Sequence, residues 1–195
     1  ALVGFGNASP QPGLQLDATR IDLGDQVAGT ASGGRVLGVV NNGQAGLNIS
    51  SLVVTGTQAA EFSLGGSCAV GTAVPAQGSC TIAVRTTPAS LGARAAMLVL
   101  ASNAPVGTVG VSLAATGLPA PAPAVSLSQA ALGFGTVAIG GSSSPRTVVL
   151  ANTGNAALQL GSLATSSSEF RLTHDCPASL APGASCSLGV VYAPT

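Results

Sequence analysis

The chain repeats itself, and this repetition constrains its fold more than any other feature of the sequence. When the sequence is shifted by 111 residues, the segment that starts at Pro12 lies on the segment that starts at Pro123. The offset falls to 108 at Glu61 and to 106 at Cys80, because the first copy has short extra loops. Apolar, glycine, arginine and cysteine positions recur in the same order. We therefore predict one module of roughly 100 residues that is written twice.

The same alignment divides the chain. The first six residues lie on Ser112–Gly117, the last apolar segment of the first copy. We expect four parts: the last strand of a preceding repeat with its linker (1–9), a first repeat (10–118), a Pro/Ala linker (119–123) and a second repeat without its last strands (124–195). By strand addition, the first six residues could complete the open edge of a neighbouring subunit. These candidate residues are Ala1, Leu2, Val3, Gly4, Phe5 and Gly6.

The local pattern is that of β-strands. Short apolar runs bounded by Gly and Pro predict strands at 61–66, 79–87, 93–102 and 108–116, with counterparts at 169–173 and 185–193. An Asn-x-Gly turn lies between two apolar runs in each copy, at 41–43 and 152–154, and predicts a hairpin there. No segment keeps a helical period long enough for a crossover helix. About seven strands in each copy predict an all-β chain of tandem immunoglobulin-like sandwiches.

The composition disfavours several classes of partner. Only 6% of the residues are charged, and the net charge is zero. All six basic residues are arginines, and they stand singly, whereas nucleic acids and anionic membranes are bound by clustered basic residues. The longest apolar run, at 95–101, is far shorter than the roughly 20 residues of a membrane span. We expect no nucleic acid partner, no direct membrane insertion and no cofactor.

The four cysteines form one pair in each copy. Four cysteines allow three pairings, but only Cys68 with Cys80 and Cys176 with Cys186 respects the repeat. We expect two disulfides; four buried free thiols are the alternative. A zinc site usually shows close CxxC pairs or additional histidine ligands, and neither is present. Disulfides imply an oxidising compartment, which predicts an extracellular, cell-surface or periplasmic location.

Catalytic chemistry has few candidate residues. His174 is the only histidine, and in a strand its neighbour Asp175 would project to the opposite face. We expect a surface histidine beside a disulfide. Glu61 and Glu169 occupy equivalent positions in the two copies, as a catalytic pair would not, and a capping or turn role fits them better. We therefore predict no enzyme and no catalytic residues.

A calcium site is the remaining metal hypothesis. Asp17, Asp22 and Asp25 are oxygen ligands of the kind that Ca²⁺ prefers. Their counterparts in the second copy are Ser128, Gly133 and Thr136, so the repeat does not preserve such a site. We predict no metal site.

The second copy resembles a known family. Its motifs are an N-T-G turn at 152–154, a Glu-Phe step at 169–170 and a P-G-x-S-C turn at 182–186, and the first copy adds a terminal Gly-rich strand at 110–117. Together they are similar to the bacterial choice-of-anchor D repeat, which is related to the abnormal-spindle and Hydin (ASH) domains. The resemblance covers nearly the whole chain. It implies seven-stranded sandwiches, usually in tandem on exported bacterial proteins, and it implies no shared catalytic residues.

These observations favour a structural role. Tandem sandwiches with proline-rich linkers predict a rod, stalk or fibre at or beyond the cell surface. Its partners would be further copies of itself or adjacent repeats of the same chain, and head-to-tail strand addition would give a homopolymer. The alternative is a glycan- or protein-binding module of a secreted enzyme or receptor. Sugar sites usually expose aromatic rings, but we expect Phe62, Phe134 and Phe170 to lie in the core.

Overall fold

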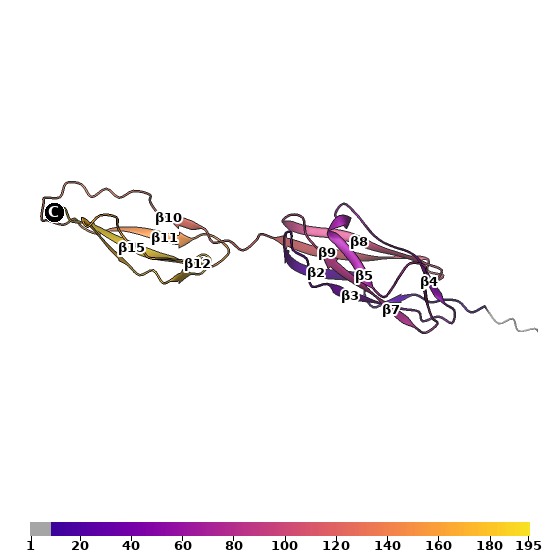
Figure 1. The fold of residues 1–195 in the computed structure, drawn as a ribbon. Coiled ribbons are helices and arrows are strands. Elements are labelled where there is room, and N and C mark those ends of the chain that lie inside the picture. The colour runs from indigo at the N-terminus through magenta and orange to yellow at the C-terminus, as the bar shows by residue number, and fades with distance from the viewer. Residues whose placement is uncertain (1–8) are drawn as a thin grey trace, which may run out of the picture. The chain divides into compact units, whose positions relative to one another are not determined.

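The computed structural model describes residues 9–195, and the chain divides into two compact units. Unit 1 is Ala1–Ala120 and unit 2 is Pro121–Thr195 (Figure 1). The only helix in the described residues is a single 3₁₀ turn, η1 (Ala59–Glu61). Within 9–195 no helix has the length and hydropathy needed to cross a bilayer. The candidate donor residues Ala1–Gly6 lie outside the described part of the chain.

Unit 1 contains two sheets. The first has the strand order β1-β3-β7-β5, formed by β1 (Gln15–Leu16), β3 (Arg35–Val40), β7 (Ser79–Thr86) and β5 (Phe62–Gly66). The second has the order β2-β9-β8-β4-β6, formed by β2 (Arg20–Val27), β9 (Thr108–Leu118), β8 (Gly92–Ser102), β4 (Leu47–Thr55) and β6 (Ala73–Val74). All neighbouring strands are antiparallel except β2 and β9, which run parallel.

The core of unit 1 lies between these two sheets. Leu37 and Ile82 from the first sheet and Leu98 and Val111 from the second belong to one cluster of buried side chains. Apolar residues alternate with exposed ones along β7, which is the period of a strand with one buried face. The prediction of an all-β sandwich is confirmed.

Unit 2 contains a four-stranded antiparallel sheet and one short strand pair. The sheet has the order β10-β11-β15-β13, formed by β10 (Val125–Leu127), β11 (Arg146–Asn152), β15 (Ser185–Tyr192) and β13 (Phe170–His174). The pair is β12 (Leu158–Gln159) with β14 (Ser179–Leu180). The core cluster of unit 2 has three buried residues, namely Leu150, Leu180 and Cys186.

The predicted hairpins at 41–43 and 152–154 are wrong. β3 pairs with β1 and β7, whereas β4 pairs with β6 and β8 in the other sheet, so this connection crosses between the sheets. β11 and β12 likewise belong to different sheets. Neither Gly43 nor Gly154 has a positive φ, which the predicted turn would need. Glycine is required there because an added Cβ would collide with the backbone of Gly13 or Ala122.

A buried asparagine holds each of these crossings in place. The Asn41 side chain is fully buried, and it donates to the carbonyls of Ala45 (2.8 Å) and Val74 (3.0 Å). It also accepts hydrogen bonds from the backbone N–H groups of Gly13 and Gly43. One amide therefore satisfies four polar backbone groups on three segments that meet where the chain changes sheet.

Asn152 makes the equivalent bonds in unit 2. It is fully buried and donates to the carbonyls of Ala156 (2.7 Å) and Leu180 (3.0 Å). It accepts from the N–H groups of Ala124 and Gly154. The two units thus use the same side chain for the same local task.

Candidate functional site

Unit 2 leaves the inner face of its four-stranded sheet without a second full sheet. In unit 1 the equivalent face is covered by β8 and β9, whose inward side chains Leu98, Leu100, Val111 and Leu113 are buried. Within residues 121–195 no strand corresponds to β8 or β9. We call this surface the open face, and define it by Leu127, Leu132, Phe134, Val148, Phe170, Leu188 and Val190.

Matched positions show how much apolar surface the open face leaves uncovered. Ile82 and Val84 in β7 are each 0% exposed, but their counterparts in β15, Leu188 and Val190, are only half-buried. Leu127 at the edge of the sheet is 48% exposed. Large apolar side chains that stay in contact with water mark a surface whose burial is favourable, because burial removes apolar area from water.

The open face is hollowed and carries aromatic rings. A groove of about 370 Å³ runs over it and is lined mostly by apolar side chains. Phe134, Phe170 and Tyr192 form a cluster in which the ring centroids are 5.0 Å apart for Phe170 and Tyr192, 5.8 Å for Phe134 and Phe170, and 6.1 Å for Phe134 and Tyr192. We predicted that Phe62, Phe134 and Phe170 are core residues. Phe62 is buried, but Phe134 and Phe170 are half-buried, because no strands of the described chain cover them.

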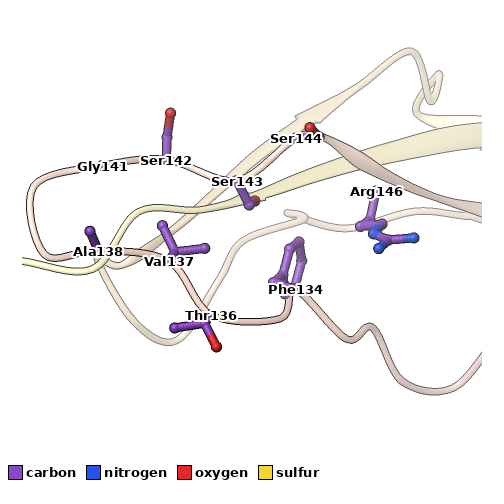
Figure 2. A pocket seen from close by; sticks show the side chains of 9 residues that line it. All are labelled: Phe134, Thr136, Val137, Ala138, Gly141, Ser142, Ser143, Ser144 and Arg146. Carbon is purple, nitrogen blue, oxygen red and sulfur yellow. The ribbon is translucent and has the colours of Figure 1, made fainter.

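The loop 134–144 contributes Phe134 to the open face and contains a second, polar hollow. This hollow is about 410 Å³ in volume, and Figure 2 shows Phe134, Val137 and Arg146 among the side chains that line it. The hydrogen bonds that fix the loop match those of unit 1. Ser143 N–H donates to the Tyr192 carbonyl at 2.8 Å, as Ser32 N–H donates to Thr86. The connection that leads into β11 is therefore tied to β15 as the connection that leads into β3 is tied to β7.

A carboxylate lies beside the open face and lacks the partner that its counterpart has. In unit 1, Glu61 pairs with Arg94 of β8 at 3.4 Å, and the two side chains are 12% and 13% exposed. Our expectation of a turn role holds for the backbone of Glu61, which closes η1, but its side chain makes no cap. Within residues 9–195, Glu169 has no ion pair. The sequence did not reveal the Glu61–Arg94 pair, because 33 residues separate its partners.

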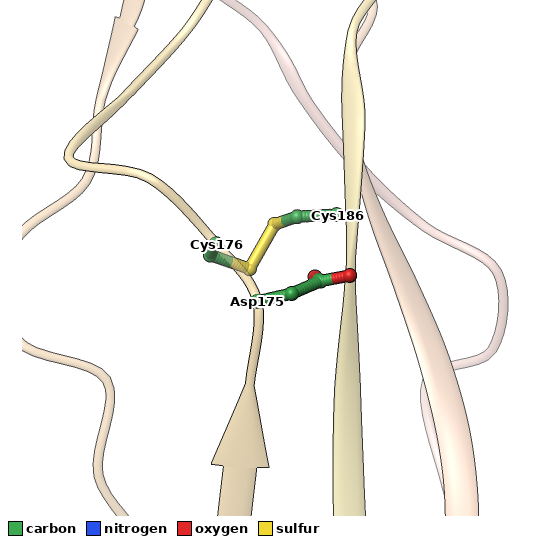
Figure 3. A group of neighbouring side chains, drawn as sticks. All are labelled: Asp175, Cys176 and Cys186. Carbon is green, nitrogen blue, oxygen red and sulfur yellow. A yellow bond between two sulfur atoms is a disulfide. The ribbon is translucent and has the colours of Figure 1, made fainter.

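The four cysteines form two disulfides, Cys68–Cys80 and Cys176–Cys186. In the described residues, the one cluster of potential metal ligands is Asp175 with Cys176 and Cys186 (Figure 3). Its two sulfur atoms are bonded to each other, so they are not thiolates and cannot ligate a metal as thiolates do. This cluster is a disulfide with a neighbouring carboxylate.

The remaining polar candidates are not assembled into a site. Asp17 accepts a hydrogen bond from the Gly38 N–H, whereas Asp22 binds Arg20 and the Gly24 N–H. Within residues 9–195, Asp17, Asp22 and Asp25 do not form a cluster of potential metal ligands. The hypothetical calcium site therefore has no geometry to support it.

His174 is exposed at the end of β13. Asp175 accepts a hydrogen bond from the Ser187 N–H at 2.6 Å, which ties the end of β13 to β15. Within the described chain no hydrogen bond links His174 to a serine or to an aspartate, so the geometry of a Ser-His-Asp mechanism is not formed there.

Comparison with known proteins gives distant likenesses. No protein-family model matches the chain, and no curated protein matches it in sequence. Among solved structures, the ASH/PapD-like domain 7 of human CEP192 is 14% identical, with a TM-score of 0.43 over 62% of this chain and 95% of that domain. The secreted serine protease VesC of Vibrio cholerae is 18% identical, with a TM-score of 0.43 over 93% of this chain and 46% of the protease. The Escherichia coli chaperone DraB is 13% identical, with a TM-score of 0.39 over 91% of this chain and 84% of the chaperone. At these TM-scores the likenesses assign neither a family nor a function.

Proposed function

We propose that the chain is a non-enzymatic structural module of an exported bacterial protein, of the choice-of-anchor D type that its sequence motifs resemble. The observation that carries this proposal is the open face of unit 2, an apolar sheet surface that a sandwich normally keeps covered. A surface of this kind joins a module to further strands. The module contributes to a rod, stalk or fibre at or beyond the cell surface.

The two disulfides support the location. Disulfides persist in oxidising compartments and are rare where glutathione keeps thiols reduced. One disulfide connects the segment just after β5 with the start of β7, and the other connects the segment just after β13 with the start of β15. Each therefore closes the connection between two strands. Such cross-links suit a protein that works outside the cytoplasm as an extracellular, cell-surface or periplasmic component.

The linker between the modules supports an extended arrangement. Residues 118–123 read Leu-Pro-Ala-Pro-Ala-Pro, and all six are exposed. Alternating prolines favour the polyproline II conformation and act as a semi-rigid spacer. A series of modules separated by such spacers would form an elongated chain.

Assembly through strand addition is the specific form of this proposal. Ala1–Gly6 align with Ser112–Gly117, part of the strand that covers the inner face in unit 1. Added to the open face of a second copy, these residues would make a contact that is head-to-tail and does not close on itself, which gives filaments.

Sedimentation velocity over a range of concentrations tests this assembly. We expect the chain to associate as its concentration rises, and we expect deletion of residues 1–8 to abolish the association. Leu2→Asp should have the same effect, because Leu2 aligns with Leu113, which is buried on the inner face of unit 1, whereas Ser9→Asp in the linker should have none. A chain that stays monomeric at all concentrations while unit 2 unfolds cooperatively would refute head-to-tail assembly.

A binding module for a glycan or a protein is the second candidate. The half-buried rings of Phe134, Phe170 and Tyr192 favour it, because aromatic side chains supply the stacking surface of many sugar sites. Binding to a glycan panel that is lost in Phe134→Ala would support this candidate over the structural role.

A further inference from the structure

The open face lies between two segments that are strands in unit 1. In the second sheet of unit 1, β9 and β8 lie between β2 and β4. The counterparts of β2 and of most of β4 are residues 131–138 and 160–166, and neither segment is a strand. Within residues 9–195 no strand pairs with either segment, although the Leu160 N–H donates to the Ala178 carbonyl. In unit 1, two strands lie between their counterparts, so we expect room for two strands here.

The segment 131–138 already has the backbone shape of its counterpart. Gly24 lies at the irregularity where β2 meets β9 and has a φ of 73°. Gly135 at the matched position has a φ of 67°. A positive φ is costly for most residues but not for glycine. Gly135 therefore keeps this feature of Gly24 although no strand of residues 9–195 pairs with the segment.

Charge specifies one feature of the strand that fits. Glu61 and Glu169 occupy the same place in their units. The backbone carbonyl of Glu61 accepts a hydrogen bond from Thr87, the residue after β7, and that of Glu169 accepts one from Ala193, the residue after β15. In unit 1 the incoming strand β8 brings Arg94 to Glu61. A strand that takes the place of β8 in unit 2 would have an arginine within reach of Glu169, which is half-buried and has no ion pair in residues 9–195.

We propose that the open face of unit 2 is an acceptor for a two-stranded β-hairpin with the chemistry of β8 and β9, and that Glu169 is its polar anchor. The hairpin presents apolar side chains at alternate positions to Leu188 and Val190, and an arginine near the start of its first strand pairs with Glu169. This inference rests on the proposed function, because it assumes that the open face is a joining surface. A hairpin that fills both strand positions leaves no place there for Ala1–Gly6 of a second copy, so the two occupants are alternatives that the test below separates. The inference goes further by naming the element and the charge that this surface selects.

The test appends the fitting hairpin to the chain. A copy of Ser90–Leu118 follows Thr195, because Pro88 aligns with Pro194 and the register then continues. Tyr192 is the only tyrosine, the chain has no tryptophan, and Tyr192 lies beside the open face, so tyrosine fluorescence reports on unit 2 alone. We expect the extended chain to show weaker acrylamide quenching of Tyr192 and a later unfolding transition in denaturant than the original chain.

A double-mutant cycle then tests the anchor. Arg94→Met in the appended copy and Glu169→Gln in unit 2 should each raise the unfolding equilibrium constant of unit 2 at least about tenfold, and the double variant should show coupling between the two positions. Arg94→Met at its native place in unit 1 is the matched control and should leave the Tyr192 transition unchanged.

The outcomes separate this inference from the proposed function. Protection of Tyr192 that does not depend on the arginine would overturn the anchor but keep the open face as a joining surface. No protection of Tyr192 by the appended hairpin, together with none in the original chain at high concentration, would overturn both. Protection of Tyr192 in the original chain at high concentration only, with none added by the hairpin, would overturn the hairpin and support a second copy as the occupant.

Discussion

At the scale of single residues, Asn41 and Asn152 do more than their sequence context suggests. Asparagine before glycine usually indicates an exposed turn, but both amides are fully buried and each binds backbone groups of several segments. A buried amide with its partners satisfied can specify where a chain changes sheet, because no aliphatic side chain of that size can replace its bonds.

Asn152→Ala should destabilise unit 2 by about 2–4 kcal/mol, because it leaves buried carbonyl and N–H groups without partners. Denaturant unfolding followed by Tyr192 fluorescence measures this loss. Asn41→Ala is the matched control, since it should destabilise unit 1 and leave the Tyr192 transition in place. A change below about 0.5 kcal/mol for Asn152→Ala would show that water replaces these bonds at little cost.

At the scale of elements, strand formation in this chain depends on the neighbour as much as on the sequence. Short apolar runs bounded by Gly and Pro predicted β5, β7, β8, β9, β13 and β15, and the structure forms a strand at each of them. Residues 131–138 align with β2 and yet form no strand, because no neighbour of the described chain supplies their ladder bonds. The local sequence pattern sets the propensity of a segment to form a strand, but the segment becomes a strand only when a neighbouring strand supplies its hydrogen bonds.

The sequence alone could not predict the connections at 41–43 and 152–154 or the ion pair between Glu61 and Arg94. The Asn-x-Gly turns have the composition of a hairpin, and the crossing between sheets depends on strand pairing and on the bonds of Asn41 and Asn152 to distant segments. The contact between Glu61 and Arg94 arises from the way η1 and β8 pack. The repeat revealed the cysteine pairs, because only pairing within each copy keeps the two copies alike.

The disulfide should matter most in the unit with the smaller core. Cys176→Ser with Cys186→Ser should lower the free energy of unfolding of unit 2 by about 3 kcal/mol, since the reduced unfolded chain gains conformational freedom. Tyr192 fluorescence again reports the transition. Cys68→Ser with Cys80→Ser should leave the Tyr192 transition where it is; a shift of that transition would mean that the two units do not unfold independently.

At the scale of the whole molecule, the two units contain equivalent four-stranded sheets, and within residues 9–195 only the sheet of unit 1 has its inner face covered by a second full sheet. Unit 1 buries the inner face of its first sheet under β8 and β9, whereas unit 2 leaves the equivalent face partly exposed to water. The second unit also keeps the features that a completed sandwich uses, namely the positive φ of Gly135, the loop bonds to Tyr192 and the carboxylate of Glu169. A module with these features is suited to joining further strands.

Amide hydrogen exchange of the original and the hairpin-extended chain, followed segment by segment, tests this claim most directly. Residues 131–138 and 160–166 should exchange rapidly in the original chain at low concentration and become protected in the extended chain, because both gain a ladder partner. The amides of β7 serve as the internal reference and should exchange equally in both chains. Equal exchange of 131–138 and 160–166 in the two chains would contradict the account.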